Sequence, residues 1–177
     1  CGALSGGSVI ENVAFSEDIK ATLNCLSALG AEYEIDGSTV KTGGISPDKA
    51  VKCTELFCNE SGSTLRFLIP LCLLFGQKIT LKGTQRLMSR SLAVYKEMCL
   101  SQGIEFTEDK ESVTVCGKLT AGKYSVRGDV SSQVISGLMF ALPLLGSDSI
   151  IYITGALESG SYLGMTGKAL ADFGVRI

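Results

Sequence analysis

Helix-ending glycines and helix prolines recur in this chain at nearly constant intervals, and this periodicity restricts the folds open to it. Gly30, Gly103 and Gly174 each end an apolar pattern with helical spacing, and they lie 73 and 71 residues apart. Pro70 and Pro143 are also 73 residues apart, and each follows an aromatic residue by three positions. A period of this length, with matched helix signals, predicts repeated supersecondary units.

Each complete unit is predicted to run strand, helix, strand, helix, hairpin (βαβαββ), and the first copy lacks its beginning. We expect one domain over residues 1–177 with three pseudo-repeats at about 1–44, 45–118 and 119–177. Period-2 and period-3.6 patterns place the elements. The expected strands are 8–12, 31–36, 39–42, 50–57, 78–82, 104–107, 113–116, 124–127 and 149–154, with another beginning at Val175. The expected helices are 16–30, 62–76, 90–102, 131–145 and 162–173.

Two of the expected helices are apolar nearly all round, which sets the layer order. Residues 65–75 and 135–145 have no polar face, so they should be buried on every side. The hairpin strands alternate apolar and polar residues and keep one solvated face. The sequence therefore predicts an α/β (α+β) domain with helices inside and sheets outside, the reverse of the usual doubly wound order. Pro70 and Pro143 predict a kink or a late start in these helices.

Composition narrows the classes of function. The chain is 45% hydrophobic with a net charge of −2, so it can fill a core and carries no basic field for nucleic acid. It has seven cysteines and no histidine, which argues for reduced thiols in a cytoplasmic protein and against a metal site or histidine-based catalysis. Neither a signal peptide nor a membrane-spanning run is present. Because it opens without methionine close to a strand, we expect a domain from a longer protein.

In the segment 59–70, small polar residues come directly before an apolar run that is predicted to be helical. This composition suits a helix start whose backbone amides bind an anion. Serine and threonine side chains can cap the first helical turn, and glycine lets a ligand approach the backbone closely; the residues are Ser61, Gly62, Ser63 and Thr64. Arg66 in the first turn opposes the helix dipole unless an anion compensates it. The alternative is an ordinary capped core helix in which Arg66 pairs with a surface carboxylate.

Two further loops carry polar groups before helices. Arg86 and Arg90 are four residues apart with no acid between them, so they either share an anion or are two solvated arginines. Ser131, Ser132 and Gln133 open the third unit's long helix and can bind phosphate and hydroxyl groups. For this trio the alternative is a serine cap with glutamine completing an analogue of the capping box.

A fourth loop lies at the point in its unit that Arg86 occupies in the preceding unit. There Ser159 can donate to a phosphate and Tyr162 can lie along a ring; the alternative is a turn with Ser161 as a helix cap. Pseudosymmetry would gather all four loops at one end of the domain. Converging helix N-termini would focus positive potential there, which suits a small molecule with several acidic groups.

These four loops resemble those of the EPSP synthase (3-phosphoshikimate 1-carboxyvinyltransferase) family. The motifs are Glu-Ser-Gly-Ser-Thr-Leu-Arg at 60–66, Gly-Thr-Gln-Arg-Leu-Met-Ser-Arg at 83–90, Ser-Ser-Gln-Val-Ile-Ser-Gly-Leu at 131–138 and Leu-Glu-Ser-Gly-Ser-Tyr-Leu-Gly-Met-Thr at 157–166. The resemblance implies one of two domains of βαβαββ units, with helices inside, in an enolpyruvyl transferase-like inside-out barrel. It also implies transfer of an enolpyruvyl group from phosphoenolpyruvate to the 5-hydroxyl of shikimate 3-phosphate, with release of phosphate, in aromatic amino acid biosynthesis.

The resemblance also implies a role for each loop residue. Those that would hold shikimate 3-phosphate are Ser131, Ser132, Gln133, Ser159 and Tyr162. Those that would hold phosphoenolpyruvate are Gly62, Ser63, Arg86 and Gln133, with Arg66 and Arg90 as supporting charges. No cofactor or metal is expected, and the protein should be a cytoplasmic monomer. The family's general acid–base residues and its other basic ligands belong to the second domain, so this chain should hold half a site and be inactive alone.

Three positions depart from the family pattern, and two other identities compete. Glu60 stands where many members have asparagine, and Ser91 and Ser161 stand where proline is usual. One rival is the sister transferase that uses UDP-N-acetylglucosamine, although the Ser-Ser-Gln and Ser-x-x-Tyr loops favour shikimate phosphate. The other is a repeat domain without enzymatic function, whose loops are only caps.

Overall fold

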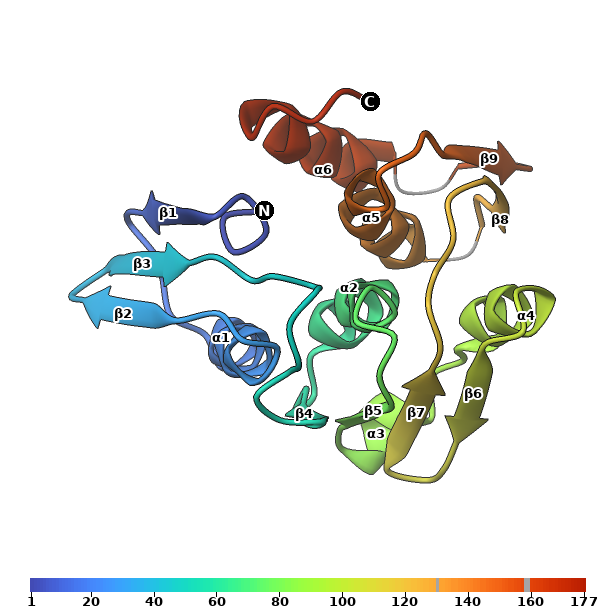
Figure 1. Cartoon of the computed structure of the whole chain (residues 1–177), viewed down its shortest axis with the longest axis horizontal. Coiled ribbons are helices and arrows are strands. Elements are labelled where there is room, and N and C mark those ends of the chain that lie inside the picture. Colours follow the sequence, from blue (N-terminus) through green and yellow to red (C-terminus); the bar gives the residue numbers. More distant parts are fainter. Residues whose placement is uncertain (130, 158–159) are drawn as a thin grey trace.

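Two apolar helices lie at the centre of the molecule, with sheets around them (Figure 1). The described residues form three sheets. The computed structural model describes residues 1–129, 131–157 and 160–177. The central helices are α2 (Gly62–Cys72) and α5 (Ser132–Ala141), which pack against each other. Most of their residues are buried, as their lack of a polar face requires. The predicted α/β arrangement with helices inside and sheets outside is therefore confirmed.

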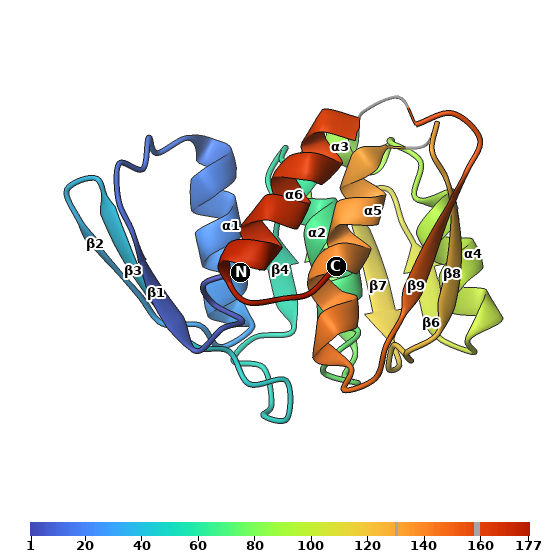
Figure 2. The same ribbon diagram turned by 90° about the horizontal axis from the view of Figure 1, so that it is seen from above.

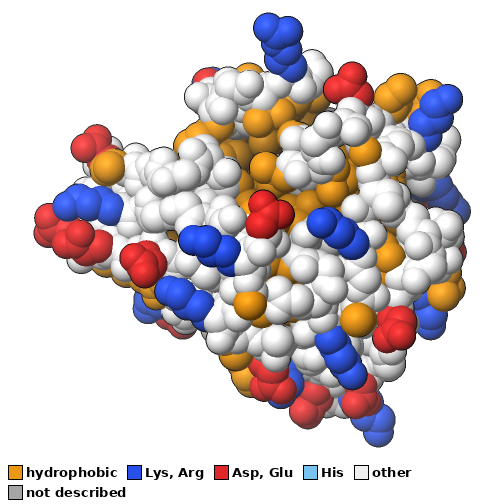
Figure 3. Space-filling model, viewed as in Figure 1, with side chains coloured by type: hydrophobic (Ala, Val, Ile, Leu, Met, Phe, Trp, Pro, Cys, Tyr) orange, Lys and Arg blue, Asp and Glu red, His pale blue; other side chains and the backbone are white. Residues whose placement is uncertain are grey.

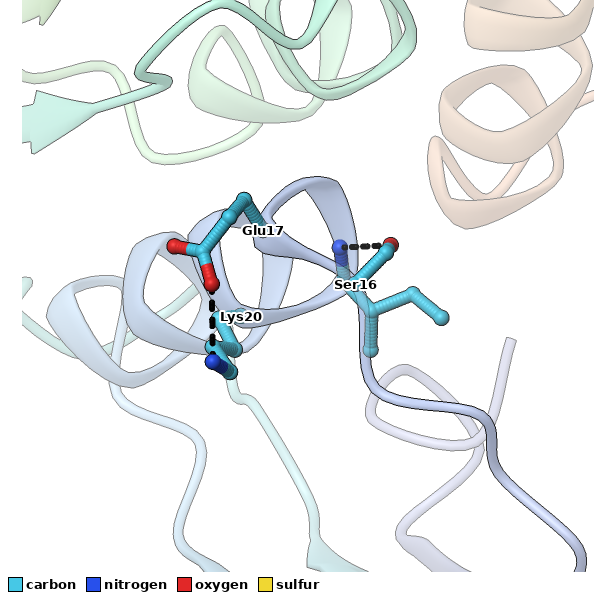
Figure 4. A network of polar contacts seen from close by, with 4 residues as sticks. Ser16, Glu17 and Lys20 are labelled. Carbon is cyan, nitrogen blue, oxygen red and sulfur yellow. Dashed lines mark hydrogen bonds and ion pairs between the residues drawn. The ribbon is translucent and has the colours of Figure 1, made fainter.

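The N-terminal sheet is antiparallel in the order β1-β3-β2. Its strands are β1 (Gly7–Ile10), β2 (Tyr33–Asp36) and β3 (Thr39–Gly43). Helix α1 (Glu17–Ala28) connects β1 to β2 and begins where predicted, because the Ser16 hydroxyl accepts a hydrogen bond from the Ile19 amide at 3.3 Å. Glu17 and Lys20 form a 2.8 Å ion pair on its exposed first turn (Figure 4).

The second sheet has the order β4-β5-β7-β6 and contains a parallel pair. Strand β4 (Glu55–Phe57) runs parallel to β5 (Ile79–Lys82), with α2 as the crossover between them. Two helices, α3 (Gln85–Met88) and α4 (Ala93–Ser101), then lead to the antiparallel hairpin β6 (Glu105–Glu108) and β7 (Ser112–Cys116). The predicted hairpin is therefore present.

The third sheet pairs β8 (Lys123–Arg127) with β9 (Ile150–Thr154) in parallel. The connection is α5 followed by a 3-10 turn, η1 (Leu142–Leu144), and α6 (Gly160–Asp172) follows β9. The β8–β9 pair corresponds to β4–β5, and the order β1-β3-β2 corresponds to β5-β7-β6. These correspondences support three repeats within one domain, which stays a proposal.

Several expected element bounds need correction, beginning with the helix expected at 62–76, which ends at Cys72. The strand expected at 50–57 begins only at Glu55, and no strand forms at Val175. The helix expected at 90–102 is shorter, and the separate helix α3 precedes it. The helix expected at 131–145 ends at Ala141, and η1 contains Pro143, because proline cannot continue the α-helical hydrogen bonds.

Pro70 does not stop α2, because Tyr95 satisfies the carbonyl that the proline leaves free. Proline has no amide hydrogen, so the carbonyl of Arg66, four residues earlier, has no helical partner. The buried Tyr95 hydroxyl donates to this oxygen at 2.6 Å. Gly137 of α5 lies against the same point, where an added Cβ would be 2.5 Å from the Arg66 carbonyl oxygen. One contact therefore joins α2, α4 and α5.

Replacing Tyr95 with phenylalanine should lower the free energy of unfolding by about 1–3 kcal/mol, because it leaves a buried carbonyl unpaired. Urea denaturation measures the change. Tyr33→Phe is the matched control, since the Tyr33 hydroxyl donates to Asn24 at 3.0 Å in an exposed position. That control should change stability far less. Equal stability of Tyr95→Phe and the parent chain would contradict the role of this hydrogen bond.

An apolar groove separates the N-terminal sheet and α1 from the central helices. Leu23 and Leu26 of α1 line it together with Leu71 of α2 and Phe140 of α5. Figure 3, viewed in the same direction as Figure 1, shows apolar side chains gathered near the middle of this face.

None of the helices in the described ranges is long and apolar enough to cross a bilayer. All seven cysteines are free thiols, four of them buried.

Candidate anion site at the start of helix α2

Gly62 is the first residue of α2, and a network of hydroxyls holds the turn before it. The Ser61 hydroxyl accepts from the Thr64 amide at 3.3 Å and from the Thr64 hydroxyl at 2.7 Å. Thr64 also bonds to Thr22 of α1 at 2.7 Å. The cap predicted from the Ser-Gly-Ser-Thr run is therefore Ser61, and it ties the α2 N-terminus to α1.

Three polar side chains from separate parts of the chain converge on Gly62. A methyl group built at Gly62 would lie 2.8 Å from Nη1 of Arg90, 3.2 Å from Nη1 of Arg66 and 3.7 Å from Oε1 of Gln133. Arg66 comes from α2, Arg90 from the segment after α3, and Gln133 from α5. The absence of a Cβ at Gly62 thus leaves open the small space that these groups surround.

The charges around Gly62 are uncompensated within the described part of the chain. Arg66 is only 7% exposed, and its Nη1 donates to the Gly62 carbonyl oxygen at 3.4 Å. Neither Arg66 nor Arg90 forms an ion pair with a carboxylate among the described residues. The expected alternative, Arg66 paired with a surface carboxylate, is therefore not what these residues show.

Two guanidinium groups and the positive end of α2 point at the same space. Burial lowers the pKa of the Arg66 guanidinium, Tyr95 opposes this in part, and the nearby Arg90 reinforces it. Arginine stays protonated in proteins, so the cost of holding two cations together persists until an anion offsets it. A compact carboxylate or phosphate group is the ligand that fits this electrostatic arrangement.

Arg86 takes a different partner from Arg90. It lies on α3, and its Nη1 is 3.4 Å from Oε1 of Glu60, with both side chains largely exposed. Helix α3 ends at Met88, so Arg86 and Arg90 do not face each other along one helix as an anion-sharing pair would. One reaches Glu60 and the other reaches Gly62.

The Ser-Ser-Gln segment forms the start of α5, beside the start of α2. Ser131 is the N-cap: its hydroxyl accepts from the Gln133 amide at 3.3 Å and donates to Oε1 of Gln133 at 3.4 Å. The predicted serine cap is thus present, although its bond goes to the second helical residue. Ser132 is half-buried in the first turn. Capping and ligand binding can coexist here, since Gln133 also faces Gly62.

Of the remaining predicted residues, Tyr162 lies near the start of α6 and Ser63 directly follows Gly62. Tyr162 is 64% exposed on α6, and Ser63 is half-buried in the first turn of α2. Ser159 falls outside the described residues. The alternative that Ser161 caps this helix is wrong, because α6 already begins at Gly160. Figure 2 shows the N-terminal ends of α5 and α6 and the short helix α3 at one end of the molecule.

Sequence reasoning missed Tyr95, a buried residue that supports the backbone of the site. Its hydroxyl donates a hydrogen bond to the backbone carbonyl of Arg66. The signal was present: Pro70 leaves the carbonyl of the residue four positions earlier without a partner, and that residue is the arginine at the site.

Fold and site together define an α/β domain whose inner helices begin among cationic and amide side chains. The model of the family described as EPSP synthase (3-phosphoshikimate 1-carboxyvinyltransferase) matches residues 2–177. The chain belongs to the EPSP synthase family. This agrees with the resemblance of its four loops.

Curated relatives and a solved structure agree with this family. The chain is 48% identical to the 3-phosphoshikimate 1-carboxyvinyltransferase of Clostridium kluyveri, covering 99% of this chain and 42% of that protein. It is 44% identical to that of Clostridium novyi, covering 99% and 43%. It thus spans less than half the length of these relatives. EPSP synthase from Acinetobacter baumannii has the same fold, with a TM-score of 0.73, 20% identity, and coverage of 91% of this chain and 38% of that one.

Proposed function

We propose that this chain forms the shikimate-3-phosphate-side domain of an enzyme that transfers the enolpyruvyl group of phosphoenolpyruvate to the 5-hydroxyl of shikimate 3-phosphate. The observation that carries the proposal is the convergence of Arg66, Arg90 and Gln133 on Gly62 at the start of α2. The four polar loops and the family membership support it. The two Clostridium relatives are 3-phosphoshikimate 1-carboxyvinyltransferases, which supports this activity for the whole protein.

The proposed chemistry of this domain is electrostatic positioning. Two anionic substrates repel each other, and fixed donors must offset that repulsion before their reacting atoms can meet. Gly62, Ser63, Arg86 and Gln133 hold phosphoenolpyruvate, and Arg66 and Arg90 add positive charge. Ser131, Ser132, Gln133, Ser159 and Tyr162 hold shikimate 3-phosphate. Acid–base groups come from a second domain, so the chain by itself does not turn over. We propose a cytoplasmic monomer without cofactor.

A titration with shikimate 3-phosphate tests the acceptor half of the proposal. In the isotope-labelled chain, the backbone amide resonances of Ser132 and Gln133 should move, because the phosphate would lie against the first turn of α5. Ser132→Ala should weaken binding by about 1 kcal/mol, the size of one hydrogen bond. Ser101→Ala, at the far end of α4, is the matched control and should bind as the parent chain does.

Other outcomes of that titration would replace the proposal. Shifts confined to regions away from α5 would remove the acceptor role of this segment. Binding of UDP-N-acetylglucosamine in preference to shikimate 3-phosphate would favour the sister transferase. A chain that binds neither acceptor, nor inorganic phosphate, would support a repeat domain whose loops only cap helices.

A further inference from the structure

Arg86, the cation proposed to bind phosphoenolpyruvate, forms an ion pair with Glu60 of the same chain. Arg86 contacts Glu60 at 3.4 Å, whereas Arg66 and Arg90 have no carboxylate partner within the described residues. Of the three arginines near the start of α2, one therefore has an internal anion and two have none. Glu60 stands two residues before Gly62 in the chain.

Backbone contacts hold the two partners of this ion pair in place. The Thr84 amide, just before α3, donates to the Asn59 carbonyl oxygen at 2.8 Å. Asn59 has a φ of +51°, a conformation that few residues other than glycine adopt, and it directly precedes Glu60. A Cβ at Gly83 would lie 3.0 Å from the same carbonyl oxygen, so the two loops touch. The loops that carry Glu60 and Arg86 are thus held against each other, while the two side chains stay exposed.

We propose that Glu60 is a built-in competitor for Arg86, which an incoming anion must displace before Arg86 can bind it. This inference rests on the proposed function, in which Arg86 holds phosphoenolpyruvate. In the ligand-free protein the guanidinium donates to the Glu60 carboxylate. On binding, it exchanges that carboxylate for one on the ligand, and Glu60 turns to water. Glu60 thereby sets the affinity and selectivity of the site, since only a ligand with more charge or better geometry than a single carboxylate wins the exchange.

The size of the effect follows from exposure. The Arg86 side chain is 79% exposed and that of Glu60 is 51% exposed, so the ion pair is weak and easily exchanged. Removing the carboxylate should tighten anion binding by about two- to fivefold, the range that exposed ion pairs cover. A buried pair would instead lock Arg86 away from any ligand.

The test is a double-mutant cycle in the 177-residue chain, with phosphoenolpyruvate and, separately, inorganic phosphate as ligands. The dissociation constant is read from the amide resonance of Gly62. Glu60→Gln should tighten phosphoenolpyruvate binding by about two- to fivefold. In an Arg86→Ala background the same change should have little effect, because the competition acts through Arg86. Glu55→Gln is the control: it removes the same charge from another ion pair, in which the exposed Glu55 contacts the half-buried Lys82 at 2.8 Å, and it should leave affinity unchanged.

The outcomes separate this inference from the function on which it rests. Normal binding by the parent chain with an unchanged or weaker constant in Glu60→Gln overturns the inference alone. An equal gain with and without Arg86 also overturns it, since Glu60 would then act by plain repulsion. If neither phosphoenolpyruvate nor inorganic phosphate moves the Gly62 amide in any variant, the phosphoenolpyruvate half of the proposed function fails, and the inference with it.

Discussion

Replacing Gly137 with alanine is expected to lower the free energy of unfolding by about 2–4 kcal/mol, because the added methyl group overpacks the contact between the two central helices. The added Cβ would lie 2.5 Å from the Arg66 carbonyl oxygen, 3.0 Å from the Tyr95 hydroxyl and 3.1 Å from Cγ of Pro70. Two of these contacts belong to the backbone and to a proline ring, which cannot rotate away. Helix α5 must therefore move from α2, and the Tyr95 hydrogen bond is strained with it.

Gly164→Ala is the matched control for this substitution. Gly164 lies in α6, and a Cβ there would have no atom within 4 Å. Because alanine has a higher helix propensity than glycine, the free energy of unfolding of that variant should rise by about 0.5–1 kcal/mol. Urea denaturation of both variants measures the difference. If Gly137→Ala is as stable as Gly164→Ala, helices α2 and α5 can separate to accept a methyl group without loss of stability, which would contradict this prediction.

The layer order was readable from the sequence because it depends on a property of whole segments. Helices without a polar face have one stable environment, the interior, whatever their exact ends. The hairpins and the Ser16 and Ser61 caps were also predictable, since their signals lie within a few residues of each other. The separate turn α3 was missed, although its start has a local signal: the Thr84 hydroxyl accepts a hydrogen bond from the Leu87 amide at 3.2 Å.

The sequence predicted which loops form the candidate site, but not which of their side chains contact one another. The repeat period places the start of α5 at the position of the start of α2, and the start of α6 at the position of Arg86 in the preceding unit. Gly62 and Gln133 are indeed neighbours. Which arginine reaches Gly62 depends on where α3 ends, and the periodicity carries no information about that. Glu60 was noted as a departure from the family pattern, yet its pairing with Arg86 became visible only in three dimensions. The ligand roles of these residues stay proposals.

In the proposed two-domain enzyme, replacing Arg86 with alanine should weaken phosphoenolpyruvate binding by about 2 kcal/mol, or roughly 30-fold, the size of a lost charge-assisted contact. The exposed pair with Glu60 offsets little of this, because water replaces it readily. The Michaelis constant for phosphoenolpyruvate should rise while the fold stays intact. Arg86→Lys should recover only part of the affinity, since an ammonium group keeps the charge without the two-pronged geometry.

Arg176→Ala is the matched control, because it removes an exposed guanidinium near the chain end, away from the start of α2. It should leave the Michaelis constant unchanged. If Glu60 competes for Arg86, the Arg86→Ala loss should be larger when measured in Glu60→Gln than in the parent protein, by the same two- to fivefold factor that Glu60→Gln gains alone. An Arg86→Ala enzyme with the parent's Michaelis constant and rate would contradict the role of Arg86. It would leave Arg66 and Arg90, the two cations that face Gly62, as the groups that bind the anion.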